Sequence, residues 1–137
     1  MDLGEVALRF RHPARDLQFL SERLDLVPFR TWAVGEPKRA LNGDVLQGRF
    51  KGTYDYNYWI ATLAFEPSDG FTVQLNRAVE LLKRTEAVVR DHVASGGEVE
   101  IYLYLTGHTH NAGKMPAPLL ATMAELGITL WVEVFPK

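Results

Sequence analysis

The sequence lacks cysteine altogether. This absence excludes disulfide bonds, thiolate zinc sites and cysteine nucleophiles, and it suits a reducing compartment. The first residues also lack the basic character of a secretory leader, since Asp2 and Glu5 are acidic. We therefore expect a cytoplasmic protein.

Long apolar runs and an excess of positive charge are absent as well. No stretch approaches the roughly 18 apolar residues of a membrane span, so no membrane association is expected. The chain has 15 basic and 17 acidic residues, a net charge of -2, whereas binding to phosphate backbones requires clustered cations. Nucleic acid is thus disfavoured as a partner.

Glycine-rich phosphate loops and nucleophile elbows do not occur either. The sequence contains no G-x-G-x-x-G, G-x-x-x-x-G-K-[ST] or G-x-S-x-G pattern. Dinucleotide binding, P-loop chemistry and an α/β-hydrolase nucleophile are therefore disfavoured, and no cofactor is predicted.

What the sequence does contain is the periodicity of a folded domain. With 137 residues, of which 47% are hydrophobic, we expect one domain over 1-137. Apolar residues alternate in 5–10, 98–106 and 128–134, and aromatic and branched residues fill 56–65, which predicts strands. A further short strand is expected at 30–34.

Helical spacing predicts three helices between these strands. The first begins at Pro13 and runs to about Asp25, and the second is a single long helix over 71–93 that ends at Ser95-Gly96-Gly97. The third runs from Pro116 to Leu126, with Gly127 as a left-handed cap. The order predicts an α+β fold, in which a mostly antiparallel or mixed sheet of four to five strands has helices packed on one face.

A short pattern in the second quarter of the chain suggests a family. Gly35-Glu36-Pro37-Lys38-Arg39 follows Trp32, and Tyr58-Trp59 comes about twenty residues later. Together with the closing helix-glycine-strand over 119–135, this resembles the bacterial proteins grouped as domain of unknown function 4279. The resemblance implies a small bacterial α+β domain without an assigned reaction, and it supplies no catalytic residues.

The sheet face opposite the helices is the first candidate surface. Tyr, Trp and Arg are the residue types enriched at binding hot spots. The alternative is that the segment 30–57 folds over this face and makes it a second core. The residues that alternation places there are Arg9, Tyr58, Ile60, Tyr102, Tyr104, Trp131 and Glu133.

The segment 30–57 is the second candidate surface. It contains four glycines and has a net charge of +2 in an otherwise acidic chain, so it suits an anionic partner unless it is only a solvated loop. Its cations and rings are Lys38, Arg39, Arg49, Lys51, Trp32, Tyr54 and Tyr56.

Histidines and paired carboxylates offer weaker signals. His108 and His110 could share a metal ion if Glu100 or Glu133 completed the site, but two ligands alone are weak evidence and we favour a solvated loop, without a metal. We expect structural roles for His12 and His92. Glu98 and Glu100 share a strand face, where we interpret them as a solvated strand edge.

The leading hypothesis is a non-enzymatic binding or interaction domain, without cofactor, whose partner is another protein, a second copy or a small anionic ligand. A bacterial toxin neutralised by an immunity-like protein is one such partner class. The alternatives are a small metal-assisted enzyme that uses His108 and His110, and a weak single-stranded RNA binder. The predicted contact residues are Trp32, Lys38, Arg39, Trp59, Tyr102, Tyr104 and Trp131.

Overall fold

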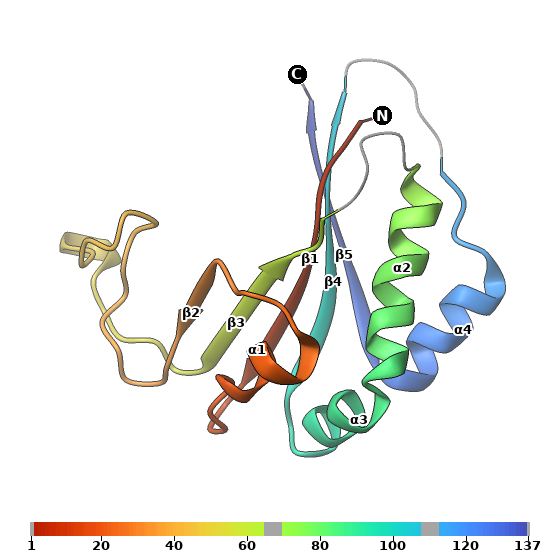
Figure 1. Ribbon diagram of the computed structural model, residues 1–137. Helices are drawn as coiled ribbons and strands as arrows, with labels where there is room; N and C mark the ends of the chain where they lie inside the picture. The colour runs from red at the N-terminus through yellow and green to blue at the C-terminus, as the bar shows by residue number, and fades with distance from the viewer. Residues whose placement is uncertain (1, 65–69, 108–112, 137) are drawn as a thin grey trace.

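Five strands and four α-helices make up the computed structural model, which describes residues 2–64, 70–107 and 113–136 (Figure 1). A 3₁₀ turn, η1, spans Gly48–Phe50. The elements in chain order are β1 (Asp2–His12), α1 (Phe19–Leu24), β2 (Arg30–Trp32), β3 (Asn57–Thr62), α2 (Phe71–Arg84), α3 (Glu86–Ala94), β4 (Glu98–Gly107), α4 (Ala117–Leu126) and β5 (Ile128–Pro136).

One mixed sheet organises the fold, in the order β2-β3-β1-β4-β5. Neighbouring strands are antiparallel except β4 and β5, which are parallel because α4 carries the chain back between them. The helices pack on one face of the sheet (Figure 1). The predicted α+β class, strand number and one-sided helix packing are confirmed.

The core lies between the helices and one face of the sheet. Along β1, Val6, Leu8 and Phe10 are fully buried, because alternate residues of a strand point to the same face. Burial of a large apolar side chain stabilises the fold by about 1.5–3 kcal/mol, so this layer supplies most of the stability. Residues of the other elements in this layer are Trp59, Leu75, Leu82, Val89, Val99, Ile101, Leu103 and Met123.

Two helices differ from the prediction. The long second helix is broken into α2 and α3 at Thr85, whose hydroxyl donates to the carbonyls of Leu81 and Leu82 and so competes with the helical backbone bonds. The first helix begins later than expected, at Phe19. The side chain of His12 accepts hydrogen bonds from the two backbone N–H groups after Pro13, which holds this turn outside a helix.

Residues 33–56, here called the arm, leave the sheet beyond β2. Isolated bridges join Pro37 to Thr53 and Arg39 to Val45, so the arm doubles back on itself. It projects past the β2 edge (Figure 1), and only at its end does Tyr56 approach β1, where the Arg11 guanidinium carbon lies 5.9 Å from the centroid of its ring. The alternative in which this segment folds over the sheet face and makes it a second core is therefore wrong, since Trp131 and Phe135 on β5 remain exposed.

Candidate binding face

The sheet face opposite the helices, here called the open face, gathers most of the predicted contact residues. Strand register aligns Arg9 with Glu100 and Tyr102 with Trp131, so side chains from β1, β4 and β5 form continuous rows. Ile60 also belongs to this face but is buried, since in register it is flanked by Arg9 and Arg30.

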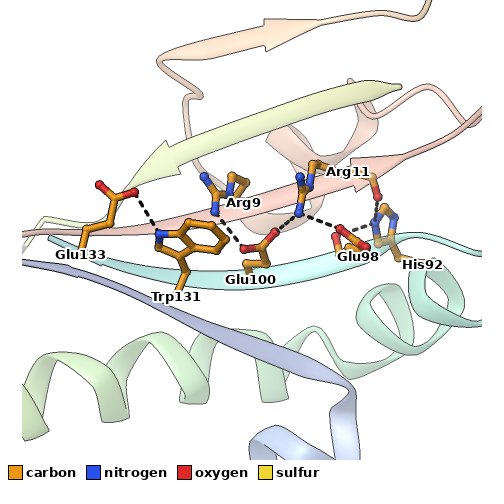
Figure 2. Close-up of polar contacts among 7 residues, drawn as sticks. All are labelled: Arg9, Arg11, His92, Glu98, Glu100, Trp131 and Glu133. Atoms are coloured by element: carbon orange, nitrogen blue, oxygen red, sulfur yellow. Dashed lines mark hydrogen bonds and ion pairs between the residues drawn. The ribbon is translucent and has the colours of Figure 1, made fainter. Parts of the chain in front are cut away.

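An ion-pair cluster occupies the centre of the open face (Figure 2). The carboxylate of Glu100 is only 3% exposed and accepts from Arg9 at 2.9 Å and from Arg11 at its other oxygen. Arg11 also pairs with Glu98 at 2.7 Å. The interpretation of the two glutamates as a solvated strand edge is wrong, because β4 lies inside the sheet and two arginines cover Glu100.

Aromatic rings surround Arg9 toward β5. Its guanidinium carbon lies 5.3 Å from the centroid of the Tyr102 ring and 5.2 Å from that of Trp131, which are cation–π distances. Glu133 accepts from the Tyr102 hydroxyl at 2.7 Å and from the Trp131 indole at 3.0 Å. Partial burial and this hydrogen bond raise the pKa of Tyr102 to about 12, so its hydroxyl remains a donor at neutral pH. Trp131 is held in place and still exposed.

Tyr104 lies further along β4 and stacks on Phe135 of β5, with ring centroids 4.5 Å apart. Tyr104 is half-buried and Phe135 is exposed. These two rings extend the aromatic surface beyond Tyr102 and Trp131. The β4–β5 side of the open face therefore presents apolar area with ordered polar groups.

A second aromatic cluster lies at the opposite side, on β2 and β3. The indole of Trp32 is stacked between Tyr58 and Tyr54, with centroids 3.9 Å and 4.0 Å away. Arg30 lies over Trp32 and donates to the Arg39 carbonyl, which ties the base of the arm to the sheet. Both faces of Trp32 are occupied, so this ring cannot offer a free platform to a nucleobase.

The predicted cations lie on the arm, outside the sheet. Lys38 and Arg39 are exposed, and the Arg39 guanidinium donates to the Gly43 carbonyl. The Tyr54 hydroxyl hydrogen-bonds with the Arg39 backbone, and the Tyr54 ring stacks on Trp32. The cations of the arm therefore begin next to the Trp32 stack. The structure thus divides the predicted set into one group at the arm and one at β4 and β5, with the ion pairs between them.

Trp59 does not belong to either group. It is fully buried on the helix side of β3, where its indole donates to Ser21 at 3.1 Å and its ring meets Phe10 edge-on. Strand alternation places it opposite its neighbour Tyr58. Its prediction as a contact residue is therefore wrong.

Two residues of the open face were missed by sequence reasoning. Arg11 continues the alternation of Arg9, and Phe135 continues that of Trp131 and Glu133. The signal was present, but both strands run further than their periodicity indicated, to His12 and Pro136.

The described histidines have structural roles, as expected. His12 bonds Ser95 through its second ring nitrogen. His92 is fully buried and donates from Nε2 to the carbonyls of Arg11 and Glu98 (Figure 2), while its Nδ1 has no partner among the described residues. Burial lowers the pKa of His92 and keeps the ring neutral.

The histidines of the alternative metal hypothesis, His108 and His110, lie outside the described residues. In the segments that the structure describes, no group of three potential ligands is placed to hold a metal ion. Glu100 and Glu133, the expected third ligands, are engaged by arginines and by Tyr102 and Trp131 respectively. The metal site stays an untested alternative hypothesis.

Comparisons with known proteins identify no relative. No family model matches the chain, and no match was found among curated proteins or solved structures. The resemblance to domain of unknown function 4279 therefore stays a prediction. Within the described segments, every helix is too short or too polar to cross a membrane.

Proposed function

We propose that this chain is a non-enzymatic interaction domain that binds a partner protein through the open face and the arm. The observation that supports this proposal is the exposure of ordered rings, beside partly buried and paired arginines, on a sheet face that carries no helix in the described structure. Trp131 and Phe135 supply apolar area at one side, while Lys38 and Arg39 supply positive charge at the other.

The order of the open face favours binding. Association normally costs about 0.5–1.5 kcal/mol for each side chain that must be immobilised. Arg9 and Trp131 are already fixed by Glu100 and Glu133, so little of this entropy remains to be lost. Preorganised aromatic and arginine side chains are typical of the residues that dominate protein interfaces.

The charges indicate an acidic partner surface. On the open face, Arg9 and Arg11 are neutralised by Glu98 and Glu100, whereas Lys38 and Arg39 on the arm are exposed. Exposed charges at the rim of an interface mainly steer association and set its salt dependence. An acidic bacterial toxin bound by an immunity-like protein is a partner of this kind.

The test compares variants in quantitative affinity enrichment from a lysate of the source cells. The double variant Tyr102→Ala/Trp131→Ala removes the β4–β5 rings, and Leu120→Ala on α4 is the control, since Leu120 is an exposed apolar residue on the helix side. We expect a protein that is retained by the wild type and the control and lost by the double variant. After purification, its Kd should rise at least tenfold, or by about 1.4 kcal/mol.

A second variant separates the arm from the sheet. Lys38→Glu/Arg39→Glu should slow association and reverse its dependence on salt, with a smaller effect on dissociation. Equal enrichment by the wild type and both double variants would contradict the proposal.

A further inference from the structure

The outer edge of β5 is an unpaired strand edge. β5 ends the sheet order, and no other described segment pairs with its free backbone groups. The strand is nine residues long, which corresponds to about 30 Å. A long edge with free N–H and C=O groups is a template for another strand.

The opposite edge of the sheet shows how such a template is blocked. β2 has only three residues, one of them Arg30, and the chain departs into the arm directly after it. Short, charged edge strands are a common protection against pairing. β5 contains one charged residue, Glu133, whose carboxylate is already bonded to Tyr102 and Trp131.

Apolar side chains flank the free edge of β5 on both faces of the sheet. Trp131 and Phe135 are exposed on the open face, and Val132 and Val134 are exposed on the helix side, at 44% and 59%. An exposed edge with apolar residues on both faces is the pattern of a strand that pairs with another chain.

We propose that β5 pairs antiparallel with β5 of a second copy of this chain, to form a two-fold symmetric dimer with a continuous ten-stranded sheet. A two-fold axis perpendicular to the sheet is the symmetry that joins identical edges in this way. It keeps the helices of both copies on one side and the two open faces on the other.

The bounds of β5 determine the register of the proposed β5–β5 pair. Residues opposite each other in an antiparallel pair point to the same face, so one residue must face its own copy at the axis. Val132 is the midpoint of Ile128–Pro136, and a pair centred on it is the one that uses the whole strand. A pair centred on Glu133 would instead oppose two carboxylates.

The side chains support the register centred on Val132. Leu130 then faces Val134 of the other copy on the helix side, and Trp131 faces Glu133 on the open face. Within one copy the Trp131 indole already donates its one N–H to Glu133, so across the axis each Glu133 faces a tryptophan and not a second carboxylate. Opposed apolar pairs such as Leu130 and Val134 each stabilise a sheet by about 0.2–1 kcal/mol.

Light scattering coupled to size-exclusion chromatography tests the dimer, with the wild type expected at twice the mass of one chain. Val132→Lys would place two like charges at the axis, and a monomer is expected. Val34→Lys is the matched control, because Val34 is 46% exposed and lies just beyond the opposite edge; it should remain dimeric. A monomeric wild type at all concentrations, or a dimer unaffected by Val132→Lys, would overturn the proposal.

Introduced cysteines test the register, since the chain has none of its own. Val132→Cys places two thiols on residues about 4.5–5.5 Å apart between Cα atoms, within the range of a disulfide. Val134→Cys leaves the thiols about 13 Å apart, because four residues separate each from its copy along the strand. Mild oxidation should cross-link the first variant at least tenfold more than the second, and equal cross-linking would contradict this register.

The inference does not depend on the proposed function. Val132 and Val134 alternate with Trp131 and Glu133 along β5, so they point to the helix side, away from Tyr102 and the ion pairs. Val132→Lys should therefore abolish the dimer while still enriching the partner of the open face, so each proposal can fail without the other.

Discussion

The two faces of the sheet use the same residue type for opposite purposes, as Trp59 and Trp131 show. Trp59 is fully buried under α1 residues and Phe10, whereas Trp131 is 45% exposed beside Arg9 and Glu133. Both lie on strands of one sheet, but alternation along β3 directs Trp59 to the helix side, whereas alternation along β5 directs Trp131 to the open face. The role of an aromatic residue here is set by the face to which its strand directs it.

The largest effect that distinguishes the faces is expected for Trp59→Ala. Removal of a fully buried indole leaves a cavity and should lower the free energy of unfolding by about 3–5 kcal/mol, as measured by urea denaturation. Trp59→Phe keeps a ring against Phe10 and should lose clearly less. If the alanine variant were as stable as the wild type, the assignment of this face as the core would be wrong.

Glu100→Gln should have the next largest effect, because it breaks the ordered centre of the open face. The buried carboxylate has charged hydrogen bonds with Arg9 and Arg11, and loss of the charge should cost about 2 kcal/mol in the free energy of unfolding.

Glu98→Gln is the control for this variant, since the Glu98 side chain is 65% exposed and an exposed pair contributes at most about 1 kcal/mol. Equal losses in the two glutamine variants would show that burial does not distinguish the carboxylates.

A smaller effect is expected from pH at the helix-side residue His92. Burial lowers the pKa of the folded ring below its usual value of 6.5, so the unfolded chain binds more protons as pH falls below that value. The free energy of unfolding should therefore be unaffected by His92 above pH 6.5. Between pH 6.5 and pH 5 it should decrease by no more than about 1.4 kcal/mol per pH unit. Urea denaturation at several pH values measures this slope.

His92→Gln removes the titrating group and should flatten the slope between pH 6.5 and 5, whatever its effect on stability at neutral pH. The same slope in this variant and the wild type would show that the proton is taken up elsewhere.

Much of the fold could be predicted because alternation is a local signal. The buried residues of β1 and β4, the helix before the last strand and the Gly127 cap follow from spacing and residue type, whereas the parallel pairing of β4 and β5 was not predicted. The break at Thr85 and the late start of α1 could not be predicted, since both depend on hydrogen bonds from side chains that are equally compatible with a continuing helix.

The candidate site was predicted less completely. The aromatic residues of the open face could be found from the alternation of side chains along each strand. The same alternation assigns Trp59 to the core once the bounds of β3 are known. The pairing of Arg9 and Arg11 with Glu100 depends on which strand lies beside β1. That neighbour is set by tertiary packing, and no spacing within one segment of the chain encodes it.

The most direct test of the account is the stability of Trp131→Ala, measured by urea denaturation in a Val132→Lys background so that pairing of copies does not contribute. The open-face ring loses only surface contacts, and we predict a decrease in the free energy of unfolding of less than about 1 kcal/mol, against several for Trp59→Ala. A decrease as large as that of Trp59→Ala would show that the ring is part of a core and would contradict the open face as a binding surface.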